Sequence, residues 1–188
     1  MKILAVLFVS IVNIFAASYT LDKNHSNVGF KVRYMMLSHV KGHFSEFEGA
    51  IQLDDNNQLI DISGTVNVSS INTDNQKRDA HLLSDDFFNA EVYPNIQFKS
   101  EQVKKTDIGY VVVGSLEIHG IKKPVAIPIE VTDIIVDQYG NKRFGVSGDV
   151  TINRKEFGVL YSKKMDNGGL IVDDYVTIML EVQAVQGS

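Results

Sequence analysis

The sequence contains no cysteine among its 188 residues. Disulfides, thiolate nucleophiles and lipid anchors attached to cysteine are therefore excluded, and the chain must be stabilised by packing of its core. The sequence also has no excess of positive charge, because 18 lysines and arginines stand against 23 aspartates and glutamates. A net charge of −5 argues against nucleic acid as a partner and against electrostatic docking on anionic membranes.

No apolar run is long enough for a comfortable membrane span, which needs about 20 residues. The longest run, residues 3–15, follows Lys2 and precedes small residues at 16–18, which is typical of a secretory signal peptide. We predict a signal peptide at residues 1–17 and one domain at residues 18–188. We expect a periplasmic or secreted protein without stable membrane insertion after cleavage, and an uncleaved N-terminal anchor is the alternative.

Apolar residues alternate with polar ones through most of the remaining chain. This period of two residues indicates strands with one buried and one solvated face. Eight such segments are predicted, at residues 28–36, 43–53, 60–70, 95–104, 109–119, 124–136, 142–154 and 174–184. Short polar turns join most of them, which favours an antiparallel, up-and-down order.

Few segments have the pattern of a helix that could cover an open sheet. We therefore predict an all-β fold, an eight-stranded antiparallel up-and-down barrel of lipocalin-like shape. Residues 71–94, between the third and fourth strands, contain a short helical segment near 78–83 that Asp74 or Asn75 could cap. Residues 155–173 form a second long loop, and long loops in compact domains often serve as lids or binding loops.

A barrel of eight strands either fills with side chains or holds one small ligand. We favour an apolar tunnel for a chain-like molecule, partly because inward positions include the glycines 64, 114 and 148. Replacing Gly114 by Phe is expected to block the tunnel and leave the fold nearly intact. The alternation predicts these ligand-binding residues, with the last two as a roof: Phe30, Val32, Tyr34, Met36, Phe98, Val112, Leu116, Ile118, Phe144, Val146, Ile178, Phe87 and Phe88.

Short motifs spread along the chain resemble those of one family of exported proteins. They lie between Tyr19 and about Ala184 and comprise HSNVGF (25–30), VKGHF (40–44), RDAHL (78–82), DFF (86–88), YP (93–94), LEIHG (116–120) and INR (152–154). In these motifs the chain is similar to the YceI family. Tyr34 departs from the family pattern, in which many members have histidine at that position.

The resemblance implies a lipocalin-like barrel that binds a long apolar molecule, with polyisoprenoid lipids as the best-attested class. It also implies a periplasmic or secreted location and, in some members, a homodimer. A true lipocalin is disfavoured, because the chain has no tryptophan and that family has a signature tryptophan. We therefore predict a non-enzymatic carrier or scavenger of a polyisoprenoid or similar lipid or amide, with no cofactor.

Four polar residues are candidates for a head-group or rim site: Arg78, Asp79, His81 and Arg154. The planar guanidinium of arginine suits a lipid phosphate. The interpretation we favour is that these residues fix the helical segment to the barrel rim. No metal site is predicted, because the five histidines lack cysteine partners and a His-Glu-x-x-His pattern. An enzyme acting on a small periplasmic molecule at this rim, and a ligand-free barrel acting through its loops, remain the rival hypotheses.

Overall fold

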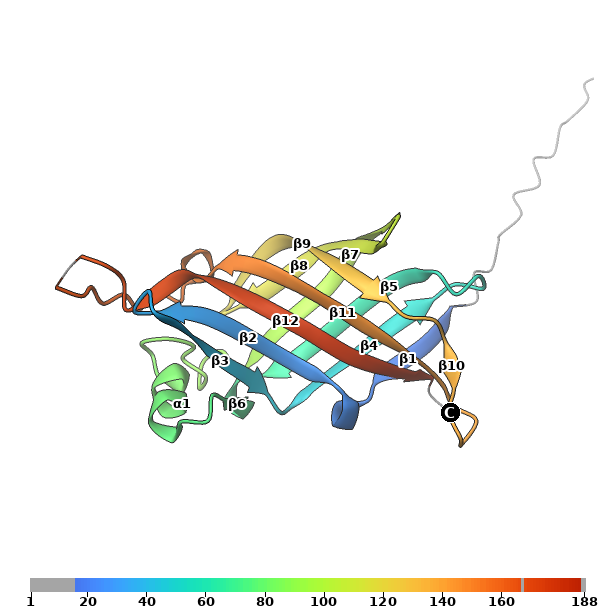
Figure 1. The fold of residues 1–188 in the computed structure, drawn as a ribbon, viewed down its shortest axis with the longest axis horizontal. Coiled ribbons are helices and arrows are strands. Elements are labelled where there is room, and N and C mark those ends of the chain that lie inside the picture. The colour runs from blue at the N-terminus through green and yellow to red at the C-terminus, as the bar shows by residue number, and fades with distance from the viewer. Residues whose placement is uncertain (1–15, 167, 187–188) are drawn as a thin grey trace, which may run out of the picture.

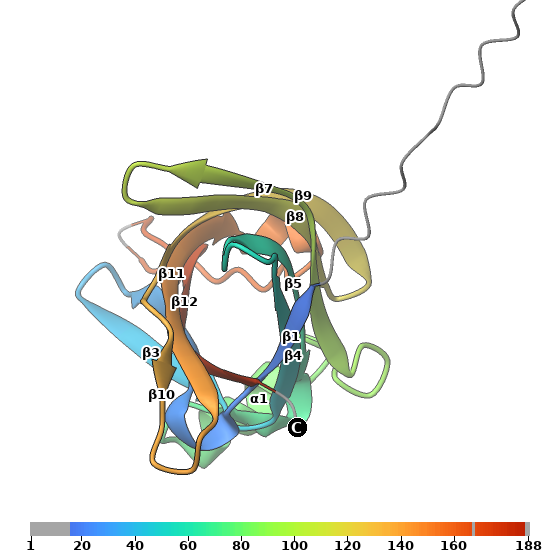
Figure 2. The ribbon, with the colours of Figure 1, turned by 90° about the vertical axis from the view of Figure 1, so that its right-hand side faces the viewer.

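A computed structural model describes residues 16–166 and 168–186, and its strands close into a barrel with antiparallel neighbours throughout (Figures 1 and 2). The predicted eight-stranded up-and-down barrel, with a helix between its third and fourth strands, is confirmed. Each strand of the ring pairs with the next, and the last pairs with the first. The ring follows the order β1 (Ala17–Leu21), β4 (Phe47–Leu53), β5 (Leu59–Asn67), β7 (Asn95–Thr106), β8 (Gly109–Ile118), β9 (Ile121–Val131), β11 (Lys142–Asn153) and β12 (Val172–Gln186).

One edge of β12 is shared by two shorter strands. Its C-terminal part pairs with β1, with Leu21 opposite Ala184, and its N-terminal part pairs with β2 (Asn27–Tyr34). β2 in turn pairs with β3 (Ser38–Phe44), and β3 makes a short pairing with β6 (Ile71–Asn72). The 3-10 helix η1 (Lys23–His25) joins β1 to β2, so these two strands act as two parts of one bent strand.

The predicted strand at 43–53 is wrong as a continuous element. It divides into β3 and β4 at Ser45 and Glu46, whose amides donate to the carbonyl oxygen (3.2 Å) and Oγ (3.0 Å) of Ser70 in the 3-10 helix η2 (Val68–Ser70). These bonds take both amides out of the strand pairing. The predicted strand at 124–136 instead spans β9 and a separate two-residue strand, β10 (Ile135–Val136).

The first strand, β1, was not predicted, because its five residues follow directly on the apolar N-terminal run. Residues 1–15 of the predicted signal peptide lie outside the described residues. Ala17, within the predicted signal segment, begins β1 and pairs with Leu53. None of the helices in the described part of the chain has the length and apolar character required to cross a membrane.

The two ends of the barrel differ. The long connections, residues 68–94 and 154–171, gather at one end, which we call the lid end; the turns at 54–58 and 107–108 mark the opposite, far end. The lid end carries α1 (Gln76–Leu83) and the 3-10 helix η3 (Arg154–Phe157). The Asn75 side chain caps α1 by accepting from the amide of Arg78 at 3.1 Å, as the sequence predicted for position 74 or 75.

Arg143 connects three segments at the far end. Its guanidinium forms ion pairs with Asp22, which caps η1, and with Asp137 (Nε–Oδ2 2.7 Å) in the β10–β11 turn. The three side chains are largely buried, with 13–23% of their surface exposed. Hydrogen bonding from Arg143 lowers the pKa of both carboxyl groups below the ordinary aspartate value.

Candidate ligand-binding cavity

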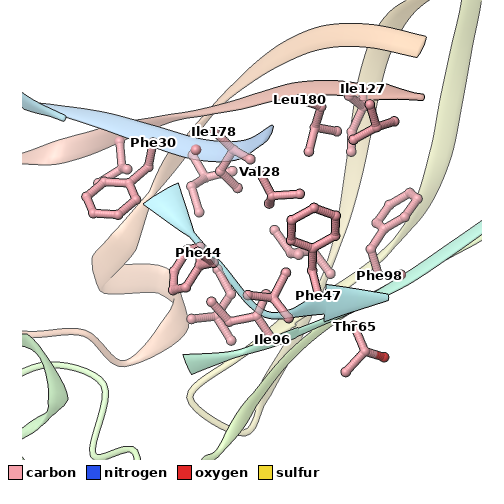
Figure 3. A pocket seen from close by; sticks show the side chains of 18 of the residues that line it. Val28, Phe30, Phe44, Phe47, Thr65, Ile96, Phe98, Ile127, Ile178 and Leu180 are labelled. Carbon is pink, nitrogen blue, oxygen red and sulfur yellow. The ribbon is translucent and has the colours of Figure 1, made fainter. Parts of the chain in front are cut away.

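A cavity of about 230 Å³ lies inside the barrel. Its walls are apolar almost throughout: among the described residues that line it, Glu48 and Arg154 are the only charged ones, and Glu48 is itself exposed to solvent. Figure 3 shows the rings of Phe44 and Phe47 among the aliphatic side chains of Val28 and Ile178. The volume lies somewhat below the roughly 300–1,000 Å³ of sites for drug-sized ligands.

Ten of the thirteen residues predicted to bind ligand lie in the cavity wall. They come from five strands, β2, β7, β8, β11 and β12, and from the segment after α1, and those in the strands face the barrel interior, as the alternation indicated. They are Phe30, Val32, Phe87, Phe88, Phe98, Val112, Leu116, Ile118, Val146 and Ile178. Their contact with a ligand stays a prediction.

The other three predicted residues do not line the cavity. Tyr34 and Met36 are 38% and 58% exposed, because β2 ends at Tyr34 and the chain turns at the lid end before β3 begins. Phe144 points inward but is 3% exposed and packs edge-on against Tyr19, with ring centroids 4.8 Å apart. These three positions are corrections to the predicted lining.

Phe144 and Tyr19 belong to a packed core that fills the far half of the barrel. Ile51, Leu53 and Ala184 are buried in the same cluster with 0–1% of their surface exposed. Close packing of this kind leaves no room for a ligand. The cavity therefore ends on this core, and the open space lies between the core and the lid end.

Several lining residues were missed by sequence reasoning. Phe44 ends β3 and Phe47 begins β4. Both were missed because one continuous strand was predicted at 43–53. Ile127 and Ile129 continue the period-two pattern of β9 and could have been found from it. Phe157 and Val159 lie in a loop without periodicity, so no local signal marked them.

Two loops meet over the cavity at the lid end. Phe87, from the segment after α1, stacks on Tyr161, from the loop after η3, with ring centroids 4.6 Å apart. His81 of α1 packs edge-on against both rings, and its Nε2 lies 2.7 Å from Asp86 Oδ2. Phe87 thus lies in the cavity wall where the two loops touch, and its role as a roof stays a prediction.

Arg78 and Asp79 both bind Thr73, which is 4% exposed. Arg78 donates from Nε to Thr73 Oγ1 at 2.7 Å and from Nη2 to its carbonyl oxygen at 2.6 Å. Asp79 Oδ1 accepts from the amide of Thr73 at 3.0 Å and from its hydroxyl. The two residues thus bind the start of α1 to the strand that precedes it, and neither lines the cavity.

Arg154 does line the cavity, and it is 5% exposed. Its guanidinium donates to the carbonyl oxygens of Asp173 (2.9 Å) and Val159 (2.8 Å) and to Asp174 Oδ1 (3.2 Å). Burial lowers the pKa of this guanidinium, whereas the charges of Asp174 and Asp173 raise it. Because its donors are directed at the protein, Arg154 clamps the ends of the 154–171 loop rather than presenting a free charge to the cavity.

The inward glycines differ in what they leave open. A Cβ atom at Gly114 would lie 2.4 Å from the carbonyl oxygen of Lys99 and 2.7 Å from the Phe98 ring. At Gly148 it would lie 2.4 Å from the carbonyl oxygen of Pro128. The expectation that phenylalanine at position 114 spares the fold is therefore wrong. Gly64 lines the cavity, and a Cβ there would meet only Glu48 O, at 3.5 Å.

The histidines do not come together. Among the described residues, no group of three or more histidines and carboxylates has the spacing of a metal site. His119, in the turn between β8 and β9, packs against Tyr93 with centroids 4.3 Å apart, and burial lowers its pKa. Within the described chain, its buried Nε2 has no hydrogen-bond partner.

Relatives of known sequence extend over most of the chain. Residues 19–184 match the family model of the YceI-like domain. A UPF0312 protein of Pseudomonas aeruginosa (strain LESB58) is 32% identical over 174 residues, which cover 91% of this chain and 88% of that protein. A UPF0312 protein of Yersinia enterocolitica is 33% identical over 147 residues, or 77% of each chain.

Solved structures share the fold. BcnA of Burkholderia cenocepacia has a TM-score of 0.76 at 23% identity, covering 87% of this chain and 98% of its own. A YCEI protein of Campylobacter jejuni has a TM-score of 0.73 at 31% identity, covering 90% and 98%. A polyisoprenoid binding domain from Saccharophagus degradans has a TM-score of 0.64 at 13% identity, covering 91% and 99%. The motif resemblance is thereby confirmed, and the chain belongs to the YceI-like family.

Proposed function

We propose that the protein is a carrier or scavenger that holds a long-chain apolar ligand, a polyisoprenoid or a similar lipid or amide, inside the barrel. One observation carries the proposal: an apolar cavity that ends on a packed core at one side and under two contacting loops at the other. Each methylene moved from water into such a cavity contributes about 0.8 kcal/mol. A chain-like ligand can therefore bind without a hydrogen bond to its tail.

The polar residues of the lid end support binding rather than catalysis. The side chains of Arg78, Asp79 and Arg154 form hydrogen bonds with backbone groups, with Thr73 and with Asp174. His81 is held by Asp86 and two aromatic rings. A catalytic group must instead reach the reacting atoms of a substrate. We therefore propose a non-enzymatic role, in which these residues keep the roof in place.

The ligand class rests on the apolar walls and on the family. The Saccharophagus degradans domain is described as polyisoprenoid binding, which makes a polyisoprenoid the first ligand to test here. We also propose export to the periplasm or medium, on the grounds of the N-terminal run. Cleavage after Ala16 would leave all five residues of β1 in the mature chain, whereas cleavage after Ser18 would remove two of them.

Native mass spectrometry of the detergent-free protein, expressed as the full chain in bacteria, tests the proposal. We expect a discrete adduct that solvent extraction releases as a long-chain lipid, and the same spectra give the cleavage site and the oligomeric state. A ligand-free mass is followed by titration with a polyprenol and a fatty amide. If neither binds, the carrier function is wrong and the loops become the place to search.

A further inference from the structure

The turn between β2 and β3 exposes bulky apolar side chains at the lid end. Leu37 is 87% exposed and Met36 is 58% exposed, and Tyr34 beside them is 38% exposed. Scattered exposed apolar residues are common, but consecutive ones at the tip of a hairpin are costly to hydrate. This turn therefore has a feature that folding of the barrel does not require.

The backbone conformation of this turn is also unusual. Met35 and Met36 have φ values of 49° and 61°, in the left-handed region where bulky residues are rare. Hairpin turns of this kind ordinarily contain Asn and Gly. Arg33 holds the strained turn by donating from Nη2 to Met36 O at 3.0 Å, and Leu37 N donates to Tyr34 O at 3.0 Å. Strain kept at an exposed site indicates a use for the side chains it presents.

Cationic residues surround this turn. Met35 N donates to Ile171 O at 2.7 Å, and Ile171 N donates to Lys163 O at 2.9 Å. These bonds place the loop that carries the exposed Lys163 and Lys164 directly beside the turn. In Figure 1 this loop projects furthest at the left end of the molecule, beyond the β2–β3 turn and beyond α1.

The local charge is opposite in sign to that of the whole protein. Residues 31–41 and 160–174 contain five basic side chains, Lys31, Arg33, Lys41, Lys163 and Lys164, against three acidic ones, Asp166, Asp173 and Asp174. The sum is +2 in a chain whose net charge is −5, and Asp174 is itself paired with Arg154 and Lys155. The exposed acidic residues 85 and 86 follow α1, and Asp86 is engaged by His81, whose ring packs on Tyr161 of the loop that carries Lys163 and Lys164. Figure 1 shows α1 set back from the tip of that loop.

We propose that this tip, formed by residues 34–37 together with Lys163 and Lys164, docks on the surface of an anionic phospholipid bilayer. Met36 and Leu37 enter the interfacial region while the lysines meet the lipid phosphates. Docking in this orientation brings the lid end against the membrane. The inference goes beyond the proposed function, because binding to the bilayer needs no ligand in the barrel.

Vesicle flotation tests the proposal on the protein purified from the soluble fraction of a host that expresses the full chain. The vesicles contain phosphatidylglycerol and phosphatidylcholine, or phosphatidylcholine alone. We expect flotation with the anionic vesicles only, and its loss at high salt. The double variant Lys163→Glu/Lys164→Glu should weaken binding by at least about 25-fold, since each lysine near an anionic surface contributes roughly fivefold. Met36→Ser/Leu37→Ser should weaken it by about tenfold or more.

Matched variants at the far end serve as controls. Lys104→Glu/Lys105→Glu makes the same change in net charge, and Ile108→Ser removes an apolar side chain that is 84% exposed. Both should float like the wild type, as should Gly64→Phe, which addresses the cavity alone. The proposal is overturned if the wild type does not bind anionic vesicles. It is also overturned if the far-end variants lose as much binding as the tip variants.

Discussion

Filling the cavity at Gly64 gives the most direct test of where a ligand lies. Gly64 is in the cavity wall on β5, opposite Gly49 on β4 and Phe98 on β7, and a Cβ there makes only an ordinary 3.5 Å contact. The side chain of a Gly64→Phe variant must therefore extend into the cavity without displacing the backbone. A ring that displaces about four methylenes of bound chain, at about 0.8 kcal/mol each, costs about 3 kcal/mol, or roughly 200-fold in affinity.

Titration with a fluorescent polyene fatty acid, competed by a polyprenol, measures this loss of affinity. Thermal denaturation checks that the Gly64→Phe variant keeps its fold. Ser147→Phe is the matched control, because Ser147 is exposed on the outer face of β11 and the same ring there should leave binding unchanged. Retention of wild-type affinity by a folded Gly64→Phe variant would refute the placement of the ligand in this cavity.

Three further perturbations address the frame around the cavity. Phe144→Ala should lower the free energy of unfolding by about 3–5 kcal/mol in denaturant titrations, because it leaves a void in a packed core; a loss below about 1 kcal/mol would contradict the tight far-end core. Asn75→Ala should remove about 1 kcal/mol from α1, seen as faster hydrogen exchange of its amides while global stability is kept. Arg143 lowers the pKa of Asp22 and Asp137 in the folded state, so its contribution is present above the unfolded aspartate pKa of about 4 and is lost as the pH falls through the lower folded values. The stability difference between the wild type and Arg143→Gln should therefore be largest near pH 7 and should shrink steadily as the pH falls from about 4 toward the lower folded values; a difference that stays constant over this range would show that the ion pairs contribute nothing.

The net charge of the whole chain does not reveal the charge of a local surface. The net charge of −5 led us to expect no electrostatic docking on anionic membranes. The fold brings residues 31–41 next to Lys163 and Lys164, which are more than a hundred positions away in the sequence. Electrostatic attraction acts over about 10 Å, so a patch of this size is sensed independently of the distant acidic residues. The docking proposal therefore needed the folded chain.

The inward glycines also differ in a way that the sequence pattern does not reveal. Gly64 and Gly114 occupy equivalent inward positions in their alternating segments, and the sequence offers no reason to separate them. Only the packing shows that Lys99 and Phe98 crowd a side chain at position 114, whereas a Cβ atom at position 64 makes only one ordinary contact. Likewise, Arg78 and Asp79 were recognised as a polar cluster, but their common partner, the buried Thr73, follows from the path of the loop.

The sequence by itself determined most of the strand pattern, the eight-stranded barrel, the position of α1 and the family. These follow from local rules: a period of two residues fixes which side chains point inward, and short motifs identify relatives. The tertiary structure alone decided which inward side chains fill a core and which surround a cavity. Phe98 and Phe144 both alternate inward, yet one lines the cavity and the other packs on Tyr19. The difference depends on which side chains lie across the barrel from each phenylalanine. Those side chains come from strands that are distant in the sequence, so no local pattern reveals them.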